Sequence, residues 1–246
     1  MTRARRRLVG LWVGGLLFIL IAFIVARWAT GNFGTVEPGR IYRSGQPGAD
    51  LTRTIRRYGI KTVLNLRGPN SAQSWYRHEL EATLAAGATH IDVPMASDQW
   101  LSRDQAQTLV DVLERAEPPL LIHCEWGAER TGLVAAMAVL LRPGATLEDA
   151  ERQFSAYYLF LPIRDGRVML GHLRLYRSWL QARGWAHSPS RFKEWVARGY
   201  RPRRLSREYW PYDPYPLKLT IRRAGGKVEE VADWSRDRAH GAKVHR

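Results

Sequence analysis

An uninterrupted apolar run, residues 8–26, restricts how the start of this chain can fold. As a helix that rises 1.5 Å per residue, the run is about 28 Å long, which is enough to cross the hydrocarbon core of a bilayer. A cleaved signal peptide is the alternative, but the run is longer than a usual signal core and no clean small-residue cleavage site follows it. The run therefore predicts an uncleaved transmembrane helix.

The arginines around this run predict its orientation. Only Arg27 follows closely, whereas four arginines precede the run: Arg3, Arg5, Arg6 and Arg7. Because positive charges tend to stay on the cytoplasmic side, we expect a cytoplasmic N-terminus, with the rest of the chain on the extracytoplasmic (periplasmic) side. The chain is thus expected to be a single-pass membrane protein.

The formal net charge of +15 comes mostly from the two ends of the chain. Residues 1–30 carry +5 and residues 187–246 carry +8, whereas residues 31–186 carry only +2. We therefore expect three parts: an arginine cluster with the membrane anchor (1–30), a catalytic domain (31–186) and a basic, aromatic C-terminal extension (187–246).

Within the extension, residues 191–223 mix arginine and lysine with tryptophan, tyrosine and proline. Such a mixture can bind nucleic acid, but the chain has no recognisable nucleic-acid module, and its anchor makes lipid the nearer polyanion. We therefore expect contact with anionic lipid headgroups and no nucleic-acid partner. Packing across the catalytic domain and a plain solvated surface remain the alternatives.

Between the two ends, short apolar strands alternate with amphipathic helices. Strands are expected at 62–66, 90–94 and 118–123, and helices near 51–58, 74–86, 130–141 and 167–181. Ser102 and Gln105 form a capping box that opens one more helix, and Thr146 and Asp149 suggest another. This alternation predicts an α/β domain with a central, mainly parallel sheet flanked by helices.

The segment 123–132, His-Cys-Glu-Trp-Gly-Ala-Glu-Arg-Thr-Gly, lies between a buried strand and the start of a helix. In such a loop the backbone N–H groups and the positive end of the helix converge on one point and form a cradle for an anion. Cys124 at the base of the cradle would be a stabilised, nucleophilic thiolate. Arg130 can hold two phosphoryl oxygens, and the Thr131 hydroxyl is placed to hydrogen-bond the thiolate.

This segment resembles the HC-x5-R-[ST]-G signature of the protein-tyrosine and dual-specificity phosphatases. The resemblance extends over about residues 38–185, and the stretches 42–46 and 59–67 are similar to those of compact bacterial members. It implies a protein-tyrosine-phosphatase-like fold and a two-step hydrolysis of phosphomonoesters without a metal or a cofactor. Cys124 would attack phosphorus, and Arg130 with the loop amides would stabilise the transition state.

The resemblance also implies an aspartate on a mobile loop upstream of the cysteine, which protonates the leaving group. Asp92 falls within a predicted strand, and Asp104 falls in the first turn of a capped helix, where a carboxylate is favourable for another reason. Asp98 lies between them in a loop and is the expected acid. A solvated loop carboxylate is the alternative.

The variable positions of the loop are expected to contact substrate: Glu125, Trp126, Gly127, Ala128 and Glu129. Two of them are acidic and none is basic, which disfavours a substrate with many phosphates. Glu129 could assist proton transfer or, as we favour, orient Arg130. Trp126 could line the pocket or pack on a neighbouring loop.

Three more residues could support the site. Arg43 and Arg67 each lie at a short predicted strand and could reach the bound anion, although a surface arginine is the commoner situation. The resemblance implies that His123 is a buried residue that shapes the loop rather than an acid or a base.

Together these features predict a membrane-anchored phosphatase that acts on phosphotyrosine, phosphoserine or phosphothreonine, or a phospholipid. One alternative is a phosphate-binding pseudophosphatase, an interaction module at the membrane, although Cys124, Arg130 and Thr131 are intact. A rhodanese-like sulfur transferase also uses a cysteine-based anion loop, but the longer loop and the upstream aspartate fit phosphoryl transfer better.

Overall fold

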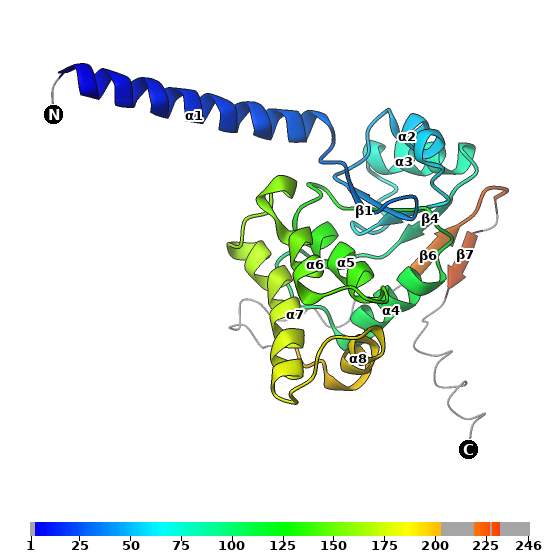
Figure 1. Ribbon diagram of the computed structural model, residues 1–246. Helices are drawn as coiled ribbons and strands as arrows, with labels where there is room; N and C mark the ends of the chain where they lie inside the picture. Colours follow the sequence, from blue (N-terminus) through cyan, green and yellow to red (C-terminus); the bar gives the residue numbers. More distant parts are fainter. Residues whose placement is uncertain (1–2, 203–218, 227, 232–246) are drawn as a thin grey trace.

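The computed structural model describes residues 3–202, 219–226 and 228–231. It begins with one long helix, α1 (Arg3–Ala29), which projects away from the body of the molecule (Figure 1). Within α1, residues Val9–Ala29 have a mean hydropathy of 2.7, and none of the most apolar stretch is buried. By length and composition α1 is able to cross a membrane, as the apolar run predicts.

The body is built on a seven-stranded sheet with the strand order β1-β2-β5-β3-β4-β6-β7. Its strands are β1 (Gly34–Glu37), β2 (Ile41–Ser44), β3 (Thr62–Asn65), β4 (Thr89–Asp92), β5 (Leu120–His123), β6 (Leu219–Arg222) and β7 (Val228–Val231). The four central strands, β2, β5, β3 and β4, run parallel, while antiparallel strands complete both edges. The predicted α/β class is confirmed.

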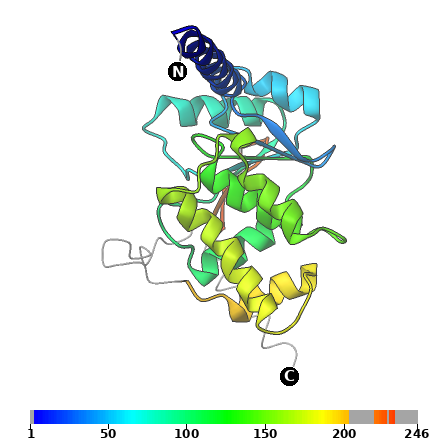
Figure 2. The ribbon, with the colours of Figure 1, turned by 60° about the vertical axis from the view of Figure 1, so that its left-hand side comes forward.

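Helices cover both faces of the sheet (Figures 1 and 2). The helices are α2 (Leu51–Tyr58), α3 (Ser74–Ala85), α4 (Arg103–Arg115), α5 (Glu129–Leu140), α6 (Leu147–Glu151), α7 (Arg164–Gln181) and α8 (Pro189–Glu194), with the single turns η1 (Arg152–Phe154), η2 (Ala156–Tyr158) and η3 (Trp195–Gly199). Helices α2 and α3 lie on one side of the sheet over a small core, and the others share a larger core. The parallel strands β3 and β5 are buried along their whole length, as apolar strands between two helical layers must be.

Both predicted capping boxes are present. The Ser102 hydroxyl accepts a hydrogen bond from the Gln105 amide at the start of α4, and Thr146 and Asp149 do the same at the start of α6. The parallel register brings the carboxyl ends of β2, β3 and β5 together, with Ser44 beside His123 and His123 beside Asn65. The segment that follows β5 therefore starts at the centre of this edge, where parallel sheets bind ligands.

The segment after residue 187 takes part in the body. Phe192, Trp195, Val196 and Tyr200 are buried in the larger core, and β6 and β7 extend the sheet beside β4. These aromatic side chains thus pack across the catalytic domain, which was one alternative for residues 191–223. Residues 203–218 of the predicted lipid-contacting segment lie outside the described residues.

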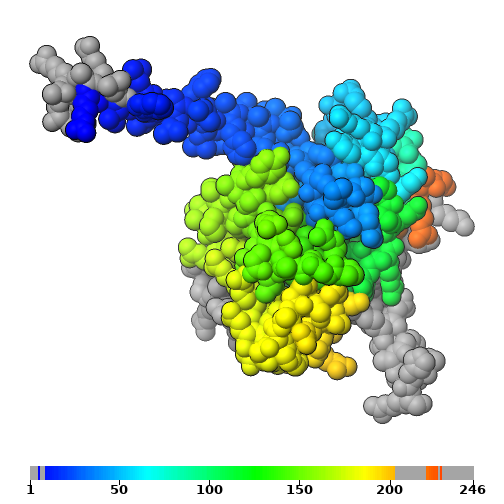
Figure 3. Space-filling model, viewed as in Figure 1, coloured from blue at the N-terminus to red at the C-terminus, as the bar shows by residue number. Residues whose placement is uncertain are grey.

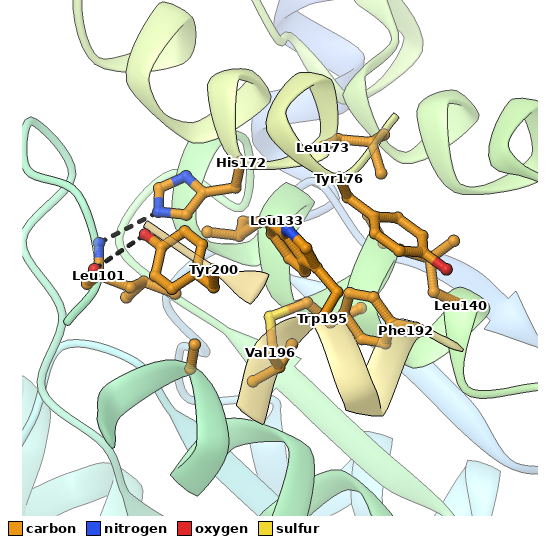
Figure 4. A pocket seen from close by; sticks show the side chains of 13 residues that line it. Leu101, Leu133, Leu140, His172, Leu173, Tyr176, Phe192, Trp195, Val196 and Tyr200 are labelled. Carbon is orange, nitrogen blue, oxygen red and sulfur yellow. Dashed lines mark hydrogen bonds between the residues drawn. The ribbon is translucent and has the colours of Figure 1, made fainter. Parts of the chain in front are cut away.

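A small apolar cavity of about 20 Å³ lies where α8 and η3 meet α5 and α7 (Figure 4). At its edge the amide of Leu101 donates to Nε2 of His172 at 3.1 Å, and the carbonyl of Leu101 accepts from the Tyr200 hydroxyl at 2.8 Å. This cavity has room for about one water molecule. The polar contacts beside it tie Leu101, at the end of the loop after β4, to α7 and to the segment after α8.

Candidate active site

The loop between β5 and α5, residues 124–128, is termed the cysteine loop below. Cys124 is buried, and the backbone N–H of Gly127 donates a hydrogen bond to its Sγ at 3.3 Å. Gly127 has φ 69°, and a Cβ added there would lie 2.5 Å from the backbone nitrogen of Gly45. Only glycine fits this tight turn, which packs against the residues that follow β2.

Arg130 is half-buried in the first turn of α5, and its Nη1 donates to the carbonyl of Met95 at 3.1 Å. This contact joins the guanidinium to the loop between β4 and α4. The Thr131 hydroxyl is buried and donates to the carbonyl of Ser44 at 3.5 Å. In this structure the thiol therefore receives its hydrogen bond from the Gly127 amide, while Thr131 faces the end of β2.

Arg43 lies beneath the cysteine loop and is fully buried. Its Nη2 donates to the carbonyl of Gly127 at 2.7 Å, and its Nη1 donates to the backbone and side-chain oxygens of Gln153 at 2.7 and 3.0 Å. The guanidinium also stacks over the Tyr158 ring at 3.8 Å. Burial lowers its pKa to about 10, so it remains a cation at neutral pH. Arg43 thus holds the loop from below through the Gly127 carbonyl.

Arg67 lies at the rim of the loop. Its Nη1 donates to the side-chain oxygen of Gln46 at 2.7 Å, and its Nη2 is 3.9 Å from a carboxylate oxygen of Glu125. The guanidinium also lies 3.7 Å over the ring of Trp75. Burial lowers the pKa of Arg67, and the nearby Glu125 opposes this shift. Arg67 is thus held at the edge of the site, where a cation can attract a phosphate.

Trp126 and Glu125 are the exposed members of the cysteine loop. Trp126 is 61% exposed. Its carbonyl, in contrast, is held from beneath, because it accepts a hydrogen bond from the side-chain amide of Asn32 at 2.9 Å. The same amide donates to the carbonyl of Tyr158 at 2.8 Å.

A buried polar cluster behind the loop was not predicted from the sequence. Glu79 on α3 contacts Nε2 of His123 at 3.0 Å and Nε2 of His90 at 2.7 Å, and it also accepts a hydrogen bond from Gln46. Although burial alone would raise the pKa of Glu79, its contacts with the two histidines lower it well below the usual range. Glu79 thus anchors the ring of His123, the residue before Cys124.

A pattern in the sequence could have indicated this cluster. Tyr76, Glu79 and Thr83 are spaced at three and four positions, so they lie on one face of α3, and all three are buried. A glutamate on the sheet-facing side of a helix requires a partner inside the protein. The sequence does not reveal that the partners come from β4 and β5, since that depends on which strands lie beneath the helix.

The three candidate acids differ in their surroundings. Asp92 is buried at the end of β4 and accepts hydrogen bonds from Tyr76, Asn65 and Arg222 at 2.6 to 2.8 Å, so it belongs to the structural core. Asp104 lies in the first turn of the capped helix α4. Asp98 is exposed on the loop between β4 and α4, the same loop whose Met95 carbonyl meets Arg130.

Glu129 and Asp165 add two carboxylates close to this loop. Glu129 is the first residue of α5, and burial raises its pKa, with a smaller contribution of the same sign from Asp165. Asp165 accepts a hydrogen bond from the Ser97 hydroxyl at 2.7 Å, which links the start of α7 to the loop that carries Asp98. The role of Asp165 was not predicted, because its neighbour is distant in sequence.

Within the described ranges, no group of three or more His, Cys, Asp or Glu side chains is placed to hold a metal ion. The cysteine loop itself has the features of an anion site. It lies at the N-terminus of α5, where the helix dipole and unpaired N–H groups favour negative charge. These amides and the half-buried arginine can bind a phosphate, and the buried thiol can attack its phosphorus.

Part of the chain is similar to known proteins. Residues 38–145 match the family model described as "Tc-R-P: Polymorphic toxin system, DSP-PTPase phosphatase". A crystal structure of P. aeruginosa TpbA in complex with pTyr is 23% identical, with 58% of this chain and 88% of that chain covered and a TM-score of 0.46. The catalytic core of the PP-IP phosphatase SIW14 from S. cerevisiae is 21% identical, with 63% and 93% covered and a TM-score of 0.47.

Proposed function

Because residues 38–145 are homologous to the cysteine-dependent tyrosine and dual-specificity phosphatases, we propose that this protein is a membrane-anchored phosphatase that hydrolyses phosphomonoesters through a phosphocysteine intermediate. Its substrates carry phosphate on tyrosine, on serine or threonine, or on a lipid. The observation that supports this proposal most is the contact between Gly127 and Cys124. The backbone N–H of Gly127 donates to the buried Sγ beside the N-terminus of α5, so sulfur and a helix end that favours anions share one site.

The first step is attack of the Cys124 thiolate on phosphorus. A sulfur–phosphorus bond forms, and the bond between phosphorus and the ester oxygen breaks. Arg130 and the loop amides bind the equatorial oxygens, on which negative charge is concentrated in the transition state. A guanidinium has five N–H donors, so Arg130 either breaks its hydrogen bond to the Met95 carbonyl or keeps it with an N–H that does not bind phosphate.

The leaving oxygen takes a proton from Asp98, which lies on the loop that meets Arg130. The deprotonated Asp98 then accepts a proton from water, which attacks phosphorus and breaks the sulfur–phosphorus bond. Inorganic phosphate leaves, and the thiolate is restored. Glu129 is a second candidate for proton transfer, because its raised pKa keeps more of it protonated near neutral pH.

The remaining residues of the site position these groups. Arg43 and His123 hold the cysteine loop from below, one through the Gly127 carbonyl and the other through Glu79. Arg67 attracts the anion at the rim, and Thr131 assists departure of the thiolate when its hydroxyl turns from Ser44 toward Sγ. Glu125, Trp126 and Ala128 complete the wall around the phosphate.

Helix α1 anchors the catalytic domain to the membrane in this proposal. With the N-terminal arginines in the cytoplasm, the domain lies on the extracytoplasmic side. The proposal keeps three parts, anchor 1–30, catalytic domain 31–186 and C-terminal extension 187–246, with the described residues of the extension packed on the catalytic domain.

The proposal is tested with the full-length protein in detergent or nanodiscs, using p-nitrophenyl phosphate as a substrate that any phosphatase of this chemistry accepts. We expect phosphate release by the wild type and none above background by Cys124→Ser. When the phosphate of the substrate is radiolabelled and the reaction is stopped by rapid denaturation, the wild-type protein should carry the label as phosphocysteine. Hydrolysis that survives Cys124→Ser would disprove the phosphocysteine mechanism.

A further inference from the structure

Helix α1 joins the body of the protein without a flexible linker. Arg27 near its end is only 8% exposed, and its guanidinium donates to the side chain of Asn32 and to the carbonyl of Phe33. It also lies 4.2 Å over the ring of Tyr157. An arginine after an apolar span usually extends into water or headgroups. Here it is folded back into the protein, which fixes the direction in which α1 leaves the body.

The same junction reaches the cysteine loop. The Gly31 carbonyl accepts a hydrogen bond from Gly45, and Asn32 donates to the Trp126 carbonyl at 2.9 Å. Asn32 follows the helix end at Ala29 by three residues, a stretch of at most about 10 Å. When residues Val9–Ala29 span a bilayer, the site is thus held beside the membrane surface.

The body exposes large apolar side chains on the side from which α1 leaves it. We term this set the apolar face: Trp28, Trp126, Tyr157, Leu161 and Ile163. Their exposed fractions lie between 54% and 68%. Contacts place Tyr157 against α1, with its ring 6.4 Å from that of Phe23. Figure 3 shows the yellow-green stretch of the chain that contains residues 157–163 beside the projecting helix.

The two aliphatic members lie in a closely packed turn. Phe160 is buried against Phe154 just before them, and Gly166 after them packs so closely on the carbonyl of Leu161 that no side chain fits there. The backbone around Leu161 is therefore closely packed, while the side chains of Leu161 and Ile163 lie outside the core. Exposing aliphatic side chains to water is unfavourable, and a cluster of them marks a surface that is covered in use.

A bilayer interface matches this surface better than a protein partner does. Tryptophan and tyrosine favour the headgroup region, and aliphatic side chains favour the acyl boundary below it. Arg164 and Arg167 are exposed at the adjacent start of α7, where they can meet lipid phosphates. The face is also continuous with a helix that is itself long and apolar enough to span the membrane.

We propose that the apolar face lies in the bilayer interface and that the cysteine loop takes its substrate from the membrane, as a lipid that carries a single phosphomonoester. This inference rests on the proposed phosphatase function and specifies its substrate class. A lipid phosphate in the leaflet next to the loop reaches Cys124 without leaving the membrane. The acidic Glu125 and Glu129 around the site disfavour headgroups with several phosphates.

The position of the face is tested without activity. Cys124 is the only cysteine in the chain, so Leu161→Cys in the Cys124→Ser background gives a single thiol for a bimane label. The full-length protein is placed in phosphatidylcholine vesicles with or without brominated acyl chains. We expect strong quenching at position 161 and little at Val228→Cys, an exposed apolar position on β7. Equal quenching at the two positions would overturn the proposal.

The substrate class is tested with phosphatidylcholine vesicles that contain phosphatidate or a phosphatidylinositol monophosphate. Leu161→Ser combined with Ile163→Ser should lower kcat/KM on the vesicle lipid by about tenfold or more and leave p-nitrophenyl phosphate hydrolysis almost unchanged. Val228→Ser should change neither activity. A soluble phosphotyrosyl peptide cleaved in preference to both lipids would overturn the inference. Absence of p-nitrophenyl phosphate hydrolysis by the wild type would instead disprove the phosphatase function, and the quenching result would still locate the face.

Discussion

The side-chain amide of Asn32 donates a hydrogen bond to the carbonyl of Trp126 at 2.9 Å and so connects the end of the apolar helix to the cysteine loop. Asn32 is buried and adopts φ 51°, a left-handed conformation that asparagine tolerates better than most residues. Its second acceptor, the carbonyl of Tyr158, lies below the same loop. One side chain therefore positions the loop relative to the anchor.

Replacing Asn32 should loosen the loop. Asn32→Ala leaves two carbonyls without their donor, which we expect to lower the free energy of unfolding by about 1–3 kcal/mol. We also expect lower kcat on p-nitrophenyl phosphate, measured in detergent together with thermal unfolding. Thr30→Ala is the matched control, since its hydroxyl bonds only to carbonyls within the helix end. A variant of Asn32 as active as the control would contradict this role.

Gly127→Ala should abolish phosphatase activity. A methyl group there would press on the Gly45 nitrogen in addition to the strain of a positive φ. Gly144→Ala separates the two effects, because Gly144 has φ 75° with nothing within 4 Å of the added carbon. The control should lose about 1 kcal/mol of stability or somewhat more and keep its activity. Steady-state kinetics and chemical denaturation of both variants check this. If the two variants lost the same amounts of activity and stability, backbone strain alone would be responsible.

Arg43→Lys should destabilise the protein although it keeps the charge. A lysine has no planar fork to reach both Gly127 and Gln153, so buried carbonyls lose their donors. We expect the free energy of unfolding to fall by about 2–4 kcal/mol. Arg53→Lys, at an exposed ion pair with Asp50, should change it by less than about 1 kcal/mol. Urea denaturation of the two variants distinguishes these outcomes.

The residue that protonates the leaving group can be identified with two substrates whose leaving groups differ in their need for a proton. Asp98→Asn should lower kcat on phenyl phosphate by about 100-fold or more, and lower it much less on p-nitrophenyl phosphate, whose phenolate leaves without a proton. Glu129→Gln is the parallel variant and should affect both substrates similarly through Arg130. If Glu129→Gln, and not Asp98→Asn, lowered kcat more on phenyl phosphate than on p-nitrophenyl phosphate, Glu129 would be the acid.

His172 should make stability fall in mild acid. Burial lowers its pKa to about 4 from an ordinary value of 6.5, and its Nε2 must stay unprotonated to accept from Leu101. Below about pH 6.5 the histidine is protonated in the unfolded chain but stays neutral in the folded chain. The free energy of unfolding therefore falls, by up to about 3 kcal/mol near pH 4. Between pH 6.5 and 4.5 the free energy of unfolding, measured by denaturation at each pH, should fall less steeply for His172→Asn than for the wild type. An unchanged slope would show that other groups cause the dependence.

Local patterns were sufficient for much of this fold. Apolar runs between amphipathic helices predicted three of the central parallel strands, β3, β4 and β5. The boxes at Ser102 and Thr146 marked helix starts, because these signals act over a few residues. The edge strands β6 and β7 were not predicted. β6 pairs with β4, which is more than a hundred residues earlier, and β7 pairs with β6. No local signal encodes the distance between β4 and β6.

The candidate site divides in the same way. Cys124, Gly127 and Arg130 belong to one short loop, so their spacing along the chain was enough to predict an anion cradle. The supports of that loop, Asn32 and Glu79, come from the end of α1 and from α3. Whether a polar side chain is buried against a given backbone group depends on how distant elements pack. The sequence alone thus predicted the anion-binding loop and the apolar helix, and the tertiary structure decided that the two are joined.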